Sequence, residues 1–303
     1  MHVYAIAEYY DVTRLEDLAA ASYLAVARDF IEVIQALCKE VFSRNAAMSK
    51  PSLVLVHGSW HNPQHFELLI PFLLNQSYKV RAVSLPSSQP LDTPPHDLAD
   101  DTATVREAVV AELDHSNNVV VVTHSYGGCP SNNALKGLDP KSRKAAGATS
   151  AVTAIVFLCA IPIPTGTSFL DAMGGKPMAI HDFSKSERFA IVGPPGPEYY
   201  CYNDLPADQA KKYSELLRPQ AWVAYEQETS YAAYGDIPAW YLYCTEDQAL
   251  PLAMQRVLVR GMEEAGAIVK TETVKSGHSP FLSVPEKTAE FIMRAAEESV
   301  KAE

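Results

Sequence analysis

The sequence lacks several features that would assign it to a specialised class of protein. It has no internal repeat, no low-complexity segment and no uninterrupted apolar run long enough for a membrane-spanning helix or a signal peptide. The N-terminal region already carries acidic side chains at Asp11, Glu16 and Asp17. These absences predict a soluble, unsecreted protein with a cytoplasmic location.

Basic residues are outnumbered and scattered. Lys and Arg total 25 against 36 Asp and Glu, which gives a formal net charge of -11, and no basic cluster interrupts this acidic balance. Such a chain repels phosphate backbones and anionic lipid headgroups. We therefore expect no nucleic-acid partner and no membrane partner, and a small molecule as the substrate.

Cysteine is scarce, and the five cysteines show no CxxC or metal-ligand spacing. Their odd number suits reduced thiols better than a complete disulfide set. A chain of 303 residues, 48% of them hydrophobic, folds without a disulfide or structural metal, because a protein of this size buries roughly 75% of its unfolded surface. The cysteines are Cys38, Cys129, Cys159, Cys201 and Cys244.

Short apolar runs alternate with helical segments along most of the chain. The β-branched runs at 53–56 and 119–122 indicate buried strands, and the segments between such runs carry apolar residues at helical spacing. The expected strands are 53–56, 79–85, 119–122, 154–158, 239–243 and 269–274, and the expected helices are 66–74, 101–114, 257–265 and 289–298. This alternation predicts an α/β fold with a mostly parallel central sheet and helices on both faces.

The chain divides into two unequal parts near Pro51. Residues 1–50 indicate a helical appendage, and residues 51–303 the α/β domain. The strands at 154–158 and 239–243 are about eighty residues apart, too far for one crossover helix. We expect a cap inserted at about 168–236, with its aromatic residues packed inside the cap rather than lining a substrate pocket.

The strongest chemical signal is the sequence Thr-His-Ser-Tyr-Gly-Gly at residues 123–128, directly after the valine-rich strand. A serine on a sharp turn between a strand and a helix presents its hydroxyl above the sheet, and small residues two before and two after it relieve crowding. Gly127 supplies the second small residue, while Thr123 replaces the usual first glycine. A Ser-x-Gly pattern alone also fits an ordinary helix start, but the preceding strand favours Ser125 as a nucleophile.

A serine nucleophile needs a base and a third group that orients the base, in the chain order serine, acid, histidine for this arrangement. His278 follows the last expected strand and Asp247 the strand before it, so both lie in loops at strand C-terminal ends. A lone histidine is more often structural, and Asp247 could instead cap a helix, with Glu246 as the acid. Three residues in the right order after three strands favour Ser125, Asp247 and His278.

The same chemistry needs N–H donors for the developing oxyanion. Tyr126, directly after the nucleophile, supplies one backbone N–H, and the loop after the first strand supplies the other at Ser59. Nearby His57, His61 and His124 have no role that the mechanism requires, so we expect them to pack or to line the pocket. No cofactor and no metal is expected.

These residues resemble the α/β-hydrolases, in particular the branch of plant methyl esterases and hydroxynitrile lyases that also holds many fungal hydrolases. The matching segments are 56–61, 124–128, 246–247 and 277–280. The resemblance implies the α/β-hydrolase fold, a catalytic triad of Ser125, Asp247 and His278, and oxyanion donors at Ser59 and Tyr126.

Two positions depart from the hydroxynitrile lyases of that branch. Those lyases resemble the esterases but carry threonine and lysine where this sequence has Gly58 and Ser279. Since no side chain is left to handle a cyanide leaving group, the lyase reaction is disfavoured.

Separately, the segment from Val3 to Leu18 is similar to the helical end of a BTB domain.

The function expected from these residues is that of a cofactor-free serine hydrolase, an esterase that cleaves a small-molecule ester, thioester or lactone through an acyl-enzyme. Two other hypotheses remain at this point: a non-hydrolytic biosynthetic enzyme, such as a cyclase or lyase with the same pocket, and a small-molecule receptor with a vestigial triad. A complete set of Ser125, Asp247 and His278 counts against the receptor, because a binding protein does not need all three.

Overall fold

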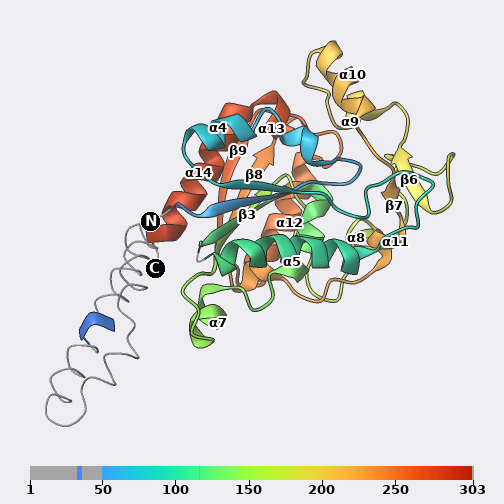
Figure 1. Ribbon diagram of the computed structural model, residues 1–303. Coiled ribbons are helices and arrows are strands. Elements are labelled where there is room, and N and C mark those ends of the chain that lie inside the picture. The colour runs from blue at the N-terminus through green and yellow to red at the C-terminus, as the bar shows by residue number, and fades with distance from the viewer. Residues whose placement is uncertain (1–32, 36–49, 116, 302–303) are drawn as a thin grey trace, which may run out of the picture. The chain divides into compact units, whose positions relative to one another are not determined.

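A parallel sheet forms the centre of the molecule in the computed structural model, which describes residues 33–35, 50–115 and 117–301 (Figure 1). Within these residues, six strands pair in parallel in the order β2-β1-β3-β4-β8-β9. The parallel pairing agrees with the mostly parallel sheet expected from the apolar runs. The strands are β1 (Ser52–Val56), β2 (Val80–Val83), β3 (Val119–His124), β4 (Val152–Leu158), β8 (Ala239–Cys244) and β9 (Val269–Val274).

The two central strands are buried along their whole length. Every residue of β3 and β4 is buried, and Val121 pairs with Ile155 in the register that joins them. Their β-branched side chains suit a strand that is covered on both faces. This burial holds the C-terminal end of β3, where Ser125 follows, in a fixed position.

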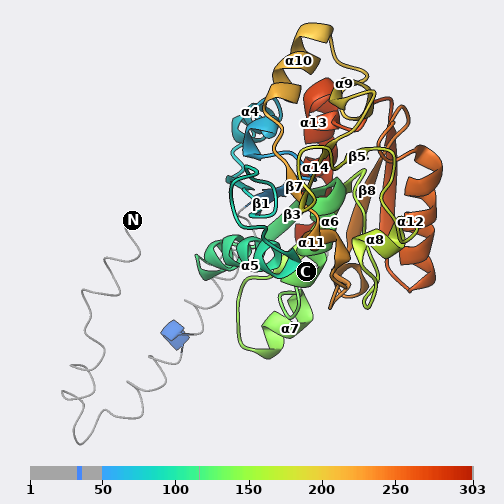
Figure 2. The same cartoon turned by 90° about the vertical axis from the view of Figure 1, so that its right-hand side faces the viewer.

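Helices cover both faces of the sheet (Figure 2). Alternation along β3 sends Val119 and Val121 to one face, where α5 (Leu98–Asp114), α6 (Gly128–Ala134) and α12 (Leu252–Glu264) contribute to the same core. Val120 and Val122 lie on the other face, with α4 (Ile70–Asn75), α13 (Pro280–Ser283) and α14 (Pro285–Lys301). The sheet therefore separates two apolar cores.

One expected helix is divided in the structure. The sequence predicts one helix over 66–74, but the 3-10 turn η1 (Pro63–Phe66) ends at Phe66 and the separate helix α4 begins only at Ile70. Asn62 caps η1 through its side chain, which accepts the N–H of Gln64. Pro71 then lies in the first turn of α4, where a missing N–H is tolerated. The two local start signals explain why the apolar pattern does not continue as one helix.

Residues 168–236, the range expected to form a cap, contain a second sheet of three antiparallel strands. Gln220 connects this segment to the loop after β2, because it accepts from Ser88 Oγ at 2.7 Å and donates to Ser87 Oγ at 2.8 Å. The elements are α8 (Phe169–Ala172), β5 (His181–Asp182), β6 (Phe189–Val192), α9 (Pro197–Tyr200), α10 (Ala207–Glu215), β7 (Gln220–Ala221), α11 (Val223–Glu226) and η3 (Ala233–Gly235).

The N-terminal expectations fall largely outside the described part of the chain. The helical appendage at 1–50 is described only at 33–35, which are helical and exposed, and at Lys50, while the BTB-like segment is not described.

None of the described helices is both long and apolar enough to cross a membrane. The four described cysteines, Cys129, Cys159, Cys201 and Cys244, are buried and free.

Candidate active site

Ser125 occupies a strained turn between β3 and the 3-10 helix η2 (Ser125–Gly127), which leads into α6. Its φ angle is 51°, a left-handed conformation that costs a non-glycine residue about 1–3 kcal/mol. Gly127 is needed for the close approach of this turn to β1, since a Cβ there would lie 2.5 Å from the His57 carbonyl oxygen. The sequence therefore stores strain at the residue expected to be the nucleophile.

His278 and Asp247 meet at the same end of the sheet. They lie after β9 and β8, and His278 Nδ1 is 2.7 Å from Asp247 Oδ2. Both residues are buried, with 4% and 5% of their surfaces exposed. The carboxylate accepts the Nδ1 proton, which leaves the imidazole Nε2 as a proton acceptor.

The loop around Asp247 is fixed by hydrogen bonds to the same carboxylate. Oδ1 accepts the backbone N–H groups of Ala249 and Leu250 at 2.9 and 2.7 Å. Gln255 on α12 donates to Oδ2 at 3.3 Å and to the backbone oxygen of Leu250 at 2.7 Å. The second acid considered from the sequence, Glu246, instead lies 3.4 Å from Lys275 Nζ on the surface. The geometry thus joins Asp247, and not Glu246, to His278.

A small pocket brings the expected residues together. Ser59, Ser125 and His278 all line it, although they come from loops after three different strands. Most of the other lining residues are apolar: Trp60, Ile161, Phe169, Met173, Met178, Ile180, Ala249 and Leu250. The aromatic residues of the cap range that the sequence predicts to pack inside the cap are not among the lining residues: Tyr199, Tyr200, Tyr202, Trp222, Tyr225, Tyr231 and Tyr234. Ser125 is therefore at the wall of an apolar cavity.

Side-chain hydrogen bonds hold the two residues expected to supply oxyanion donors. The Tyr225 hydroxyl donates to Ser59 Oγ, and the Tyr126 hydroxyl donates to Asp101 Oδ2 at 2.8 Å. Ser87 also donates to Asp101, through its hydroxyl at 2.5 Å and its backbone N–H at 2.9 Å. Burial raises the pKa of Asp101 to about 6 in spite of these bonds. Because hydrogen bonds fix these two side chains, they also restrain the backbone segments that carry the Ser59 and Tyr126 N–H groups.

Gly58 lies against Ser125. A Cβ at this position would be 2.6 Å from Ser125 Cβ and 2.9 Å from His124 Nδ1. Real Cβ atoms do not approach that closely, so any side chain would push the loop or Ser125 aside. The absence of a side chain at Gly58 is therefore a packing requirement of this site.

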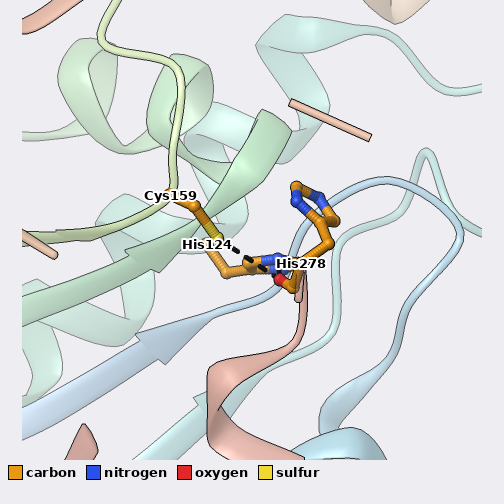
Figure 3. Close-up of side chains that lie close together, drawn as sticks. All are labelled: His124, Cys159 and His278. Carbon is orange, nitrogen blue, oxygen red and sulfur yellow. Dashed lines mark hydrogen bonds between the residues drawn. The ribbon is translucent and has the colours of Figure 1, made fainter. Parts of the chain in front are cut away.

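His124 and Cys159 both contact the backbone of His278. His124 Nε2 donates to the His278 carbonyl oxygen at 2.9 Å, and Cys159 Sγ donates to the same oxygen at 3.3 Å. Figure 3 shows both side chains directed at this backbone group rather than at the His278 ring. Burial raises the pKa of the Cys159 thiol well above its usual value, so the proton needed for donation is retained.

Within the described residues, His124, Cys159 and His278 form a group that could hold a metal ion, since their ligand atoms lie within 4.8 Å of one another. However, His124 Nε2 and Cys159 Sγ already donate to a carbonyl, and His278 Nδ1 donates to Asp247. Ligation through His124 Nε2 or Cys159 Sγ would replace the hydrogen bonds that these atoms donate to the His278 carbonyl, whereas ligation through His278 Nε2 would leave its Nδ1 bond to Asp247 intact. The cluster is accounted for by the positioning of His278.

The remaining histidines near Ser125 are neutral packing residues. His57 donates from Nδ1 to the Gly58 carbonyl at 2.8 Å and accepts the Leu85 N–H on Nε2 at 3.0 Å. Burial lowers the pKa of His57 and of His65 to about 4, and that of His61 well below 6.5. Sequence reasoning missed His65, because a histidine in a 3-10 turn carries no motif.

Sequence reasoning also missed three polar groups that brace the site. Asp101 contacts Tyr126, Gln255 contacts Asp247, and Asp204 Oδ2 accepts the N–H of Gly277, beside His278, at 2.6 Å. Asp101 and Gln255 lie on helices, where a polar residue normally indicates the solvent face. Only their burial identifies them, and burial is not visible in one sequence.

The chain is similar to known proteins in both sequence and fold. The sequence pattern of the alpha/beta hydrolase family matches residues 53–291. The chain is 28% identical to alpha/beta hydrolase nvfD of Aspergillus novofumigatus, and the match covers 84% of this chain and 100% of that protein. It is 30% identical to probable hydrolase R7 of a Phoma species, and that match covers 82% of this chain and 99% of that protein. A solved structure of a polyneuridine aldehyde esterase mutant is similar with a TM-score of 0.65 at 21% identity, covering 81% of this chain and 99% of that one.

Proposed function

The chain belongs to the alpha/beta hydrolase family, and from that premise we propose that it is a serine hydrolase that cleaves a small-molecule ester, thioester or lactone through an acyl-enzyme. One observation carries the proposal. Ser125 and His278 line one pocket, and Asp247 holds the His278 ring from the far side at 2.7 Å. In the proposal Ser125 is the nucleophile, His278 the general base and Asp247 the orienting acid.

The first half of the reaction forms the acyl-enzyme. Ser125 Oγ attacks the scissile carbonyl carbon as its proton passes to His278 Nε2, and the Ser59 and Tyr126 N–H groups stabilise the oxyanion. The bond to the leaving alcohol or thiol then breaks, and His278 returns the proton to that leaving group. Asp247 stays ionised and stabilises the imidazolium that forms.

The second half regenerates the serine. Water replaces the leaving group and gives a proton to His278 as its oxygen attacks the acyl carbon, and collapse of the intermediate releases the carboxylic acid with the proton returned to Ser125. Side chains and backbone N–H groups carry every step. A chelator should therefore leave the rate unchanged.

The pocket supports a compact, apolar substrate. Its walls are the aliphatic, aromatic and thioether side chains around Ser125, which bind hydrocarbon surface rather than charge. Several relatives have names that refer to ester or small-molecule chemistry, among them polyneuridine aldehyde esterase and pyrethroid hydrolase. Both names are consistent with a neutral organic ester as the substrate class.

A non-hydrolytic enzyme is the second candidate, since some relatives are named norfluorocurarine synthase. The same serine, histidine and acid would serve either reaction until water attacks. The receptor hypothesis is weaker, because a binding protein needs neither the strained φ of Ser125 nor the bond between His278 and Asp247.

The proposal is tested by measuring hydrolysis of short-chain p-nitrophenyl esters, thioesters and lactones by the wild type and Ser125→Ala. We expect turnover of at least one class by the wild type and a loss of several thousandfold in the variant, as for other triads. The variant should keep its melting temperature, because only one oxygen is removed. Hydrolysis that survives in Ser125→Ala would refute the role of Ser125.

A further inference from the structure

The pocket beside Ser125 contains a histidine that the proposed hydrolysis does not use. His181, on β5, lines this pocket together with Ser125 and His278. No sequence motif marks it, since it belongs to the inserted segment between β4 and β8. As a lining residue it lies beside the place of a bound substrate, and it has no part in the bond-breaking steps.

The tautomer of His181 is fixed by a local hydrogen bond. Nδ1 accepts the backbone N–H of Met178 at 3.1 Å, so the single proton of the neutral ring is on Nε2. Burial lowers the pKa of His181 to about 4, and the ring is neutral at pH 7. His181 Nε2 is buried and has no hydrogen-bond partner within the described chain. A buried donor without a partner is destabilising, so it indicates a group that binds there.

The orientation of the ring is set by aromatic neighbours. The His181 ring centroid lies 5.6 Å from Trp60, 5.2 Å from Trp222 and 5.5 Å from Tyr225, and the contact with Trp222 is edge-on. Such packing restricts rotation of the imidazole about its side-chain bonds. The Nε2–H donor is thereby pre-organised, which is the property expected of a group that selects among substrates.

The lining of the pocket limits which acceptor His181 can meet. Besides the seryl hydroxyls and the two histidines, the lining is apolar, and no described residue that lines it carries a lysine or arginine charge. A carboxylate would lose its hydration there without a cationic partner. A neutral oxygen, such as a ketone or ester carbonyl, needs only one N–H donor.

We propose that His181 determines substrate specificity, with its Nε2–H bound to a neutral oxygen acceptor on an uncharged, apolar ester whose scissile carbonyl lies at Ser125. This inference rests on the proposed serine hydrolase function and adds the class of substrate. The substrate is an ester with a second oxygen function, separated from the scissile group by a hydrocarbon skeleton.

The test compares p-nitrophenyl cyclohexanecarboxylate with its 3-oxo and 4-oxo derivatives, which differ only in the added ketone. The enzymes are the wild type, His181→Phe, which keeps a ring without a donor, and His181→Gln, whose amide nitrogen restores a donor near Nε2. We expect the wild type to prefer one oxo ester by about fivefold or more in kcat/KM, which is the effect of one hydrogen bond. That ratio should fall to about one in His181→Phe and recover in His181→Gln.

The controls separate this inference from the proposed function. All three proteins are treated with a fluorophosphonate, and the modified residue is identified by mass spectrometry. If Ser125 is labelled and the esters are cleaved, but the oxo preference is absent or the same in wild type and His181→Phe, the role of His181 is refuted and the hydrolase function stands. If Ser125 is not labelled and Ser125→Ala still cleaves the esters, the proposed function itself fails.

Discussion

Asp247 accepts the Nδ1 proton of His278 at 2.7 Å from a fully enclosed position, because the aspartate side chain is 0% exposed and the histidine side chain 6%. The adjacent Glu246 points elsewhere and lies 3.4 Å from Lys275, with 43% of its side chain exposed. Two neighbouring carboxylates therefore have different environments, although the sequence alone presents both as candidates.

This difference predicts that Asp247→Asn reduces kcat far more than Glu246→Gln. An amide at position 247 can present a donor and favour the wrong histidine tautomer, which in another serine hydrolase cost about 10⁴-fold. Glu246→Gln removes only an exposed ion pair, and we expect a change within about twofold. Steady-state kinetics of both purified variants on one activated ester decide which of the two carboxylates orients His278. Equal losses, or a larger loss for Glu246→Gln, would assign the role to another acid.

Gly58→Ala should lower kcat/KM by about 100-fold, since displacement of a reacting group by about 1 Å has a cost of that size. The reason is the 2.6 Å distance between the added Cβ and Ser125 Cβ. Gly261→Ala is the matched control, because nothing lies within 4 Å of that position on α12 and alanine favours helix. The control should keep its activity. A Gly58→Ala enzyme with more than half of the wild-type rate would contradict the packing argument.

Cys159→Ala should reduce kcat about fivefold with little change in KM, because one of two donors to the His278 carbonyl is lost. Cys159→Ser keeps a donor and should recover part of the rate. Cys201→Ala removes another buried thiol and serves as the control for stability. If Cys159→Ala and Cys201→Ala lose stability equally and neither loses kcat, Cys159 is only a packing residue.

Acid should destabilise the protein between about pH 6.5 and pH 4. Burial lowers the pKa of His57 and His65 to about 4, so in this window the unfolded chain binds protons that the folded chain does not. The contribution of these histidines to the free energy of unfolding is complete above pH 6.5. As the pH falls below that value, each histidine loses about 1.4 kcal/mol of this contribution per pH unit. Asp101 acts in the opposite direction, since its raised pKa of about 6 favours the folded state at low pH. This single carboxyl group does not offset the several buried histidines whose pKa is lowered.

Urea unfolding at pH 7.5 and pH 5 measures this effect. His65→Gln should reduce the loss of stability on acidification, whereas His115→Gln, at an exposed site on the surface, should not. Stability that is the same at both pH values in the wild type would show that the buried histidines do not remain neutral.

The central fold could be predicted because local sequence determines it. The apolar, β-branched runs at 53–56 and 119–122 indicate buried strands, and the structure places β1 and β3 there as neighbours in the sheet. The positions of the candidate site residues on motifs could also be predicted, since Ser125 follows β3, and Asp247 and His278 follow β8 and β9.

The supporting groups could not be predicted, because their partners are distant in the chain. Cys159 and His124 contact a carbonyl more than a hundred residues away, and Asp101 contacts Tyr126 from a helix on which it would be expected to face solvent. His181 contacts Trp60 only when the inserted segment folds against the loop that carries Trp60. Contacts of this kind depend on tertiary structure, which a pattern of residue types does not specify.

The central claim, that Ser125 is the nucleophile, is tested most directly by reaction with a fluorophosphonate followed by peptide mapping. We expect one adduct per chain on Ser125, with loss of hydrolysis in proportion to labelling, and no adduct in Ser125→Ala or in the urea-unfolded wild type. Asp247→Asn should label much more slowly at the same residue. An adduct on another residue, or full hydrolytic activity in a protein completely labelled at Ser125, would contradict the account.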